Sequence, residues 1–169
     1  MTNYVEISNK LCEKRVYSPD VSSHAFSKCS IRQHAEAPQG GNFMVNDIFY
    51  QLRRLGVCDP EVVEITELYV EPKERNKGHG SQLVNDIIRK HQESVIIVKA
   101  GALVSEYSEE PSQEEYDVLL PKLKRFYEAL GFTDINFYIG YEYRVPMLYT
   151  GNEVGKAILN NVVKTQQRL

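Results

Sequence analysis

The feature that most constrains the fold of this chain is a strand-like run that leads through a turn into an amphipathic helix. Residues 62–70 (VVEITELYV) are rich in β-branched and aromatic side chains, which is typical of a buried strand. Apolar residues then recur at helical spacing from about Gly78 to His91, and residues 94–100 (SVIIVKA) form a second buried-type run. A strand, a helix and a strand in this order predict a right-handed crossover between parallel strands, and therefore an α/β fold.

The remainder of the chain predicts further elements around this unit. A helix is expected to follow the capping box Ser112-x-x-Glu115 and to end at Gly131, with a kink or a new start at Pro121. The other expected elements are strands at Asn3–Leu11, Phe26–His34, Ile135–Ile139 and Val145–Tyr149, a helix at Asn46–Leu55, and a C-terminal amphipathic helix at Glu153–Val163.

Composition excludes several classes of protein. A length of 169 residues predicts one domain, and 20 Lys and Arg against 23 Asp and Glu give a net charge of −3. A dedicated nucleic-acid binder carries a basic excess, so none is expected here. Three widely spaced cysteines form neither a disulfide framework nor a Cys-x-x-Cys site. With no signal peptide and no apolar run of membrane-spanning length, we expect a cytoplasmic protein that does not contact a membrane.

The turn between residues 75 and 80 (RNKGHG) has the chemistry of a phosphate site. Glycines at the start of a helix allow a ligand to approach the backbone closely. The first N–H groups of a helix have no intrahelical partner, and the helix dipole adds partial positive charge to them. Arg75 and Lys77 add full positive charges. The turn therefore predicts a site for a phosphate or a diphosphate group.

Two common nucleotide-binding motifs do not match this chain. The dinucleotide motif Gly-x-Gly-x-x-Gly fails because Leu83 stands where the third glycine is required. The nearest approach to a Walker loop, residues 151–157 (GNEVGKA), is one residue short and ends in alanine. A glycine-rich turn with no ligand remains open on the glycines alone.

Two longer motifs favour a ligand at this turn. Residues 68–80 (LYVEPKERNKGHG) resemble the acyl-CoA signature of the GNAT superfamily of N-acetyltransferases. Residues 126–132 (FYEALGF) are similar to the Phe-Tyr-x-x-x-Gly-Phe helix end of the same family. The resemblance covers about residues 62–150. We therefore expect one GNAT domain over residues 1–169, with a divergent front at 1–60 and a C-terminal helical segment at 152–169.

The resemblance implies a three-layer α/β fold with a mixed central sheet, splayed open between its fourth and fifth strands and flanked by helices. It implies acetyl-CoA as co-substrate, with the pantetheine arm paired to the backbone of the strand and the diphosphate bound by amides of the turn. No metal ligands are predicted. The expected cofactor-binding residues are Leu68, Tyr69, Val70, Arg75, Asn76, Lys77, Gly78, His79, Gly80 and Ser81.

Three positions depart from the family pattern. Asn76 stands where the family commonly has glycine, and asparagine tolerates the positive φ that this position requires. His79 takes a position that is usually aliphatic, so a packed histidine is a better interpretation there than a catalytic one. Leu120 replaces an asparagine of many members, which removes any contact that this amide makes with CoA.

The implied reaction, direct attack of an amine on acetyl-CoA, needs two proton transfers. Tyr127 matches the family's tyrosine that protonates the departing thiolate. A base must take a proton from the amine, and Glu67 is the first candidate, with Glu64 the second. In a regular strand these two positions face opposite sides, unless a bulge intervenes. Activation of the amine through water remains an alternative.

An acidic insertion at residues 105–117 is either solvated surface or a lip that attracts a cationic amine. Tyrosines near Glu142 either line the acceptor pocket or pack on their strands; they are Tyr138, Tyr141, Tyr143 and Tyr149. The leading hypothesis is an acetyl-CoA-dependent N-acetyltransferase for a small-molecule or protein amine, as a monomer or homodimer. A catalytically inactive CoA-binding or interaction module is the alternative, and a toxin that acetylates charged tRNA is less favoured by the acidic balance.

Overall fold

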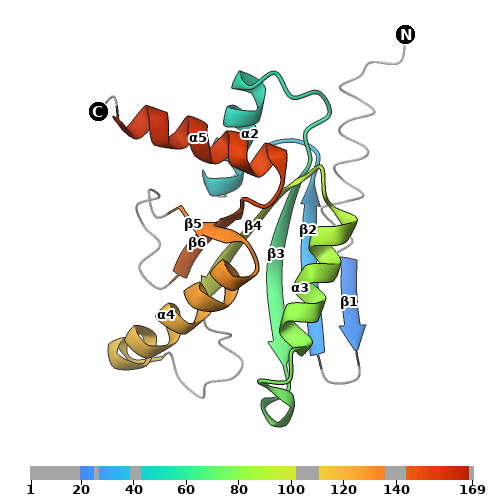
Figure 1. Cartoon of the computed structure of the whole chain (residues 1–169), viewed down its shortest axis with the longest axis vertical. Coiled ribbons are helices and arrows are strands. Elements are labelled where there is room, and N and C mark those ends of the chain that lie inside the picture. The colour runs from blue at the N-terminus through green and yellow to red at the C-terminus, as the bar shows by residue number, and fades with distance from the viewer. Residues whose placement is uncertain (1–19, 25–26, 39–42, 102–110, 136–143, 168–169) are drawn as a thin grey trace.

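The structure is a computed structural model that describes residues 20–24, 27–38, 43–101, 111–135 and 144–167 (Figure 1). Its described strands form one mixed sheet in the order β1-β2-β3-β4-β6-β5. The strands are β1 (Asp20–His24), β2 (Ser27–His34), β3 (Val62–Val70), β4 (Val95–Gly101), β5 (Phe132–Asp134) and β6 (Arg144–Tyr149). The helices are α2 (Phe43–Arg54), α3 (His79–Lys90), α4 (Gln113–Ala129) and α5 (Glu153–Gln167), with a short 3₁₀ turn η1 (Pro72–Glu74).

The predicted crossover is present. β3 and β4 are parallel neighbours joined by α3, whereas every other pair of adjacent strands in the sheet is antiparallel. β3 occupies residues 62–70 as predicted. Leu83, Val84, Ile87 and Ile88 are the buried residues of α3, which are the four that the helical spacing selects. Burial of each such side chain contributes about 1.5–3 kcal/mol, so α3 is fixed on the sheet by its apolar face.

Helices cover both faces of the sheet, which confirms the three-layer architecture. α3 and α4 lie on one face, over a core that includes Val63, Ile65 and Met147. α2 and α5 lie on the other face, over a core that includes Val62 and Leu148. Adjacent residues of one strand enter different cores because strand side chains alternate between faces.

The sheet opens between β3 and β4. The two strands are paired only over Val62–Ile65 and Val95–Val98, and the later residues of each strand have no partner across this seam. These strands are the ones that the family resemblance counts as fourth and fifth, so the predicted splay is confirmed. The opening leaves the ends of β3 and β4 free to form the walls of a pocket.

Local signals set the limits of α4 and α5. Ser112 and Glu115 form the predicted capping box, in which the Ser112 N–H donates to Glu115 Oε2 at 2.7 Å and the Glu115 N–H donates to Ser112 Oγ at 3.3 Å. α4 passes through Pro121 as one element and stops before Gly131, whose φ is 97°. Asn152 accepts a hydrogen bond from the Gly155 N–H, so the near-Walker segment is the start of a helix.

Some predicted elements differ from the structure. The strand before β6 in the described chain is β5, at Phe132–Asp134, and not the predicted strand at Ile135–Ile139. Ile135 is not in a strand, and residues 136–139 lie outside the described residues. The predicted strand at Asn3–Leu11 also lies outside them. β1 was not predicted, because its sequence (DVSSH) is polar and its extended form depends on pairing with β2.

Candidate active site

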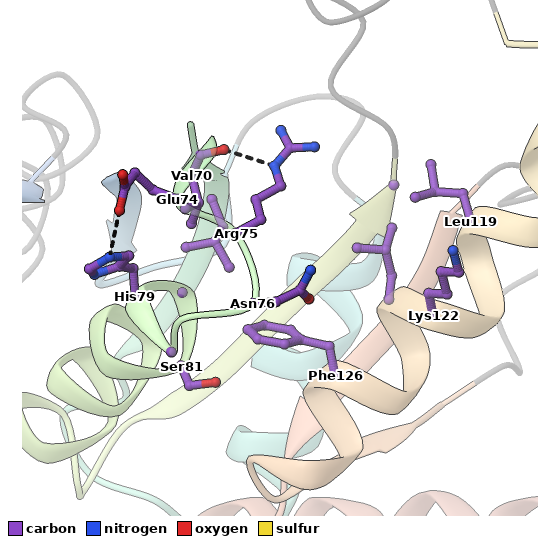
Figure 2. A pocket seen from close by; sticks show the side chains of 14 residues that line it. Val70, Glu74, Arg75, Asn76, His79, Ser81, Leu119, Lys122 and Phe126 are labelled. Atoms are coloured by element: carbon purple, nitrogen blue, oxygen red, sulfur yellow. Dashed lines mark hydrogen bonds and ion pairs between the residues drawn. The ribbon is translucent and has the colours of Figure 1, made fainter. Parts of the chain in front are cut away.

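A cavity of about 600 Å³ lies at the splayed end of the sheet, on the face covered by α3 and α4. Its walls come from the end of β3, the turn that follows, the start of α3, the end of β4 and one face of α4 (Figure 2). The lining residues are Leu68, Val70, Glu74, Arg75, Asn76, Gly78, His79, Gly80, Ser81, Gly101, Leu119, Lys122, Leu123 and Phe126.

Backbone geometry shapes the turn that enters the cavity. Asn76 has a φ of 62° and Gly78 a φ of 86°, so both adopt left-handed conformations within three residues. Asparagine and glycine are the residues that accept this region at least cost, which fits the departure at Asn76 noted from the sequence. Gly78 is the N-cap of α3, and the first intrahelical bond joins the Gln82 N–H to the Gly78 carbonyl at 3.0 Å. The N–H groups that precede it therefore have no partner within the helix.

Side-chain contacts hold this turn in place. The Arg75 Nε–H donates to the Val70 carbonyl at 2.9 Å, which closes the turn across its base (Figure 2). Glu74 accepts a hydrogen bond from Lys77 Nζ at 3.1 Å and lies 3.6 Å from His79 Nε2. The hydrogen bond from Lys77, with a smaller contribution from His79, lowers the pKa of the Glu74 carboxyl. Glu74 therefore stays ionised and fixes both neighbouring side chains.

Eight of the ten predicted cofactor residues line the cavity. The two that do not are Tyr69 and Lys77. Tyr69 pairs with Lys28, whereas Leu68 pairs with Cys29 of the core beneath α3, so Tyr69 lies on the opposite face of the sheet. Lys77 is bound to Glu74. The positive character of the cavity comes from the start of α3, from Arg75 and from Lys122.

The α4 wall of this cavity was not predicted from the sequence. Leu119, Leu123 and Phe126 lie with Leu130 on one helix face, and an apolar face of this kind by itself indicates packing. Lys122 falls on the same face because it lies three residues after Leu119 and four before Phe126. A cation within an otherwise apolar stripe was the available signal.

Tyr127 lies behind the cavity wall. It is buried, with 4% of its surface exposed, and it is not among the lining residues. Its ring packs edge-on against Phe126, at 5.0 Å between centroids, and against Phe132, at 5.3 Å. Burial, and secondarily the nearby Cys29, raise the pKa of the Tyr127 hydroxyl well above its ordinary value. The hydroxyl is therefore protonated at any working pH, and its role as the acid stays a prediction.

A β-bulge changes how the two candidate bases are arranged. Ile31 of β2 pairs with Ile65 but Ser30 pairs with Glu67, so Thr66 is an extra residue on β3. The Thr66 hydroxyl donates to the Ser30 carbonyl at 3.1 Å, which secures the bulge. With the alternation shifted by one, Glu64 and Glu67 lie on the same face of β3. That face is opposite to the one that bears the cavity.

The surroundings of these two carboxylates differ. Glu64 is buried, with 5% of its surface exposed, and lies 3.2 Å from His34 Nε2 and 3.5 Å from Lys99 Nζ. The Glu67 side chain is 38% exposed and lies 3.6 Å from Lys28 Nζ. Glu67 is thus the carboxylate that a solvent-borne molecule can reach, whereas Glu64 is held within the sheet.

Other predicted residues are only partly described. In the acidic insertion Glu114, Glu115 and Asp117 belong to the first turns of α4, and residues 105–110 lie outside the described residues. Tyr138, Tyr141, Glu142 and Tyr143 also lie outside them, while Tyr149 packs edge-on against Phe132. Among the residues that the structure describes, no group of three or more His, Cys, Asp or Glu side chains is placed to hold a metal ion. Within the same ranges, no helix combines the length and apolarity needed to cross a membrane.

Buried Cys29 gives the site a pH-dependent stability. Burial, and secondarily Glu67, raise the pKa of the Cys29 thiol from 9.0 to about 12. Below pH 9 the folded and unfolded chains both hold the proton; above pH 9 only the folded chain keeps it, so stability falls. Between pH 8 and 11 the free energy of unfolding of the wild type should fall by about 2–3 kcal/mol more than that of Cys29→Ala.

Urea unfolding at a series of pH values measures this difference. Cys58→Ala, at an exposed cysteine, is the matched control and should keep the wild-type pH dependence. Parallel curves for wild type and Cys29→Ala would contradict the expectation. The cavity that alanine leaves lowers stability equally at every pH, so the test compares the slopes of the two curves and not their heights.

Comparison with known proteins identifies the family. The model of the "Acetyltransferase (GNAT) domain" matches residues 43–134, which is more than half of the chain and starts earlier than the 62–150 expected from the motifs. This chain belongs to the GNAT acetyltransferase family. No functionally curated protein matches it.

Several solved structures are also similar to this chain. Arabidopsis thaliana NAA60 in complex with a bisubstrate analogue has 14% identity and a TM-score of 0.42; 73% of this chain is covered, and this chain spans 62% of that one. The structure of "histone acetyltransferase HPA2 and related acetyltransferase" from Corynebacterium glutamicum has 13% identity and a TM-score of 0.44; the match covers 83% of this chain and 70% of that one. FeeM, an N-acyl amino acid synthase from uncultured soil microbes, has 11% identity and a TM-score of 0.47; the match covers 93% of this chain and 88% of that one.

Proposed function

We propose that this protein is an N-acetyltransferase that moves an acetyl group from acetyl-CoA to an amine by direct attack. The observation that carries the proposal is the cavity at the splayed end of β3 and β4, bordered by the N-terminus of α3. Its apolar walls (Leu68, Val70 and Phe126) suit the pantetheine arm of CoA, and the amides of Gly80 and Ser81 suit its diphosphate.

The splay also supplies the route between the two reactants. Acetyl-CoA enters from the face of α3 and α4, while Glu64 and Glu67 lie on the opposite face. An acceptor approaching from that second face meets carboxylates, which favours a cationic amine. An amine such as a lysine side chain has a pKa near 10.4 and is mostly protonated at neutral pH, so a base must deprotonate it first.

Each catalytic role has a structural argument. Glu67 is the proposed base because it is half-exposed and follows the bulge, nearest the opening. Glu64 is the second candidate, and its contacts with His34 and Lys99 suit a group that orients its neighbours. Tyr127 is the proposed donor to the CoA thiolate, since its hydroxyl stays protonated and its ring packs against Phe126, which lines the cavity.

One observation favours a second function, a CoA-binding module without catalysis. Tyr127 is buried and does not line the cavity. Its hydroxyl therefore contacts the thioester only if the pantetheine arm of bound acetyl-CoA extends into the opening between β3 and β4. Both candidates bind acetyl-CoA, and only the enzyme consumes it.

A thiol-release assay separates the two functions. The purified protein is incubated with acetyl-CoA and a panel of polyamines, amino acids, aminoglycosides and peptides with free N-termini or lysines, and free CoA is measured. Amine-dependent release, with acetylated amine detected by mass spectrometry, is the expected result. Acetyl-CoA binding without release for any amine would favour the binding module. Glu67→Gln should slow release with its pH profile altered, whereas Glu71→Gln, at an exposed residue outside the cavity, should not.

A further inference from the structure

Lys122 of α4 is a cation in the cavity wall opposite the start of α3. We propose that Lys122 binds the diphosphate of the CoA donor, so that this group is held between α3 and α4. This inference rests on the proposed function. Nothing in the family motifs of this chain assigns a role to Lys122. The assignment comes from its position on α4, from its lack of partners among the described residues and from the charge of the ligand that the cavity suits.

The spacing of α4 places Lys122 in the cavity. Leu119, Lys122, Leu123 and Phe126 follow the i, i+3, i+4, i+7 pattern of one helix face, and all four line the cavity. Of the three apolar residues, Leu123 and Phe126 also pack against the core beneath α3. Figure 2 shows Lys122 on α4 and Ser81 at the start of α3 on opposite sides of the cavity.

Lys122 differs from Lys77, Arg75 and Lys124 because it has no hydrogen bond or ion pair among the described residues. Lys77 is bound to Glu74, and the Arg75 Nε–H is bound to the Val70 carbonyl. Lys124, two residues further along α4, lies 3.3 Å from Asp134 and 3.8 Å from Glu128. Lys122 makes no hydrogen bond or ion pair with any residue in the described part of the chain. Its ammonium is therefore available to an incoming anion.

The chemistry of the donor selects the diphosphate. The apolar side chains of the cavity match the neutral pantetheine arm, and the N–H groups of Gly80 and Ser81, which precede the first intrahelical bond, bind one phosphate. A diphosphate carries a second negative phosphate next to the first. Lys122 faces the start of α3 across the same cavity and supplies a charge-assisted hydrogen bond to this second phosphate.

The test measures acetyl-CoA affinity by calorimetry for Lys122→Gln. A charge-assisted hydrogen bond at an exposed side chain predicts a Kd about 10-fold higher than that of the wild type. Lys122→Arg should restore the affinity to within about threefold, because it keeps a cation at the site. Lys124→Gln is the matched control on the same helix and should leave the Kd unchanged, since its partners lie outside the cavity.

Two further ligands, 3′-dephospho-CoA and S-acetyl-pantetheine, locate the contact. With 3′-dephospho-CoA the loss for Lys122→Gln should again be about 10-fold, because the diphosphate is intact. With S-acetyl-pantetheine, which has no phosphate, wild type and variant should have the same kcat/KM. An unchanged Kd for acetyl-CoA, or a loss that disappears with 3′-dephospho-CoA, would overturn the assignment while leaving the proposed function standing. A wild-type protein that binds no acetyl-CoA would overturn both.

Discussion

Replacing Gly80 with leucine is expected to raise the Kd for acetyl-CoA by at least about 100-fold while the protein remains folded. Gly80 lines the cavity at the second position of α3. A Cβ atom built there points at Phe126, Val70 and Leu68, all of which also line the cavity. The three further carbons of leucine therefore occupy the volume that the pantetheine arm requires.

Gly80→Ala is the matched control for this experiment. The nearest atoms to an added Cβ are the Phe126 ring at 3.5 Å, Val70 at 3.6 Å and Leu68 at 3.7 Å, which are ordinary van der Waals distances. Alanine also favours the helix over glycine by up to about 1 kcal/mol, so this variant should be at least as stable as the wild type. Calorimetric titration should find acetyl-CoA binding within about threefold of wild type for alanine and no measurable binding for leucine. Equal affinity for the two variants would contradict the placement of the donor in this cavity.

Replacing Tyr127 with phenylalanine is expected to lower kcat about 100-fold without changing the Kd for acetyl-CoA. The ring keeps its edge-on contacts with Phe126 and Phe132, so the substitution removes only the hydroxyl. Because burial raises the pKa of that hydroxyl, it stays neutral throughout the working pH range, as the proposed donor to the thiolate must. The loss should therefore have the same size across neutral pH and show no ionisation of Tyr127.

The control for this substitution is Tyr116→Phe, at a second buried tyrosine of α4 that does not line the cavity. It should retain the turnover of the wild type. Steady-state rates for the best amine acceptor, together with the Kd from calorimetry, separate an effect on chemistry from one on binding. Unchanged kcat in Tyr127→Phe would exclude the hydroxyl as the acid and leave the CoA site intact.

The local parts of the fold were predictable from sequence because their signals are local. β3 and the apolar face of α3 follow from periodicity over a few residues, and the start of α4 follows from the Ser112 and Glu115 capping box. Residues 75–80 predicted a phosphate site at the turn, which stays a prediction, and eight of the ten predicted cofactor residues line one cavity.

The features that were missed depend on residues far apart in the chain. The bulge at Thr66 arises from pairing with Ser30, 36 residues earlier, and a threonine within a β-branched run gives no sign of it. Regular alternation would place Glu64 and Glu67 on opposite faces, so the common face of the two carboxylates was not predictable. Lys122 was likewise hidden, since a helix face with three apolar residues indicates core unless the opposite wall is known.

A calorimetric titration of acetyl-CoA into the wild-type protein and Gly80→Leu side by side decides whether this cavity holds the acetyl donor. Saturable binding at one site in the wild type and none in the variant is expected, with both proteins folded by circular dichroism. Binding of equal strength in both would place the donor outside the cavity between β3, α3 and α4. No binding to the wild type at millimolar acetyl-CoA would contradict the assignment of this cavity to the acetyl donor altogether.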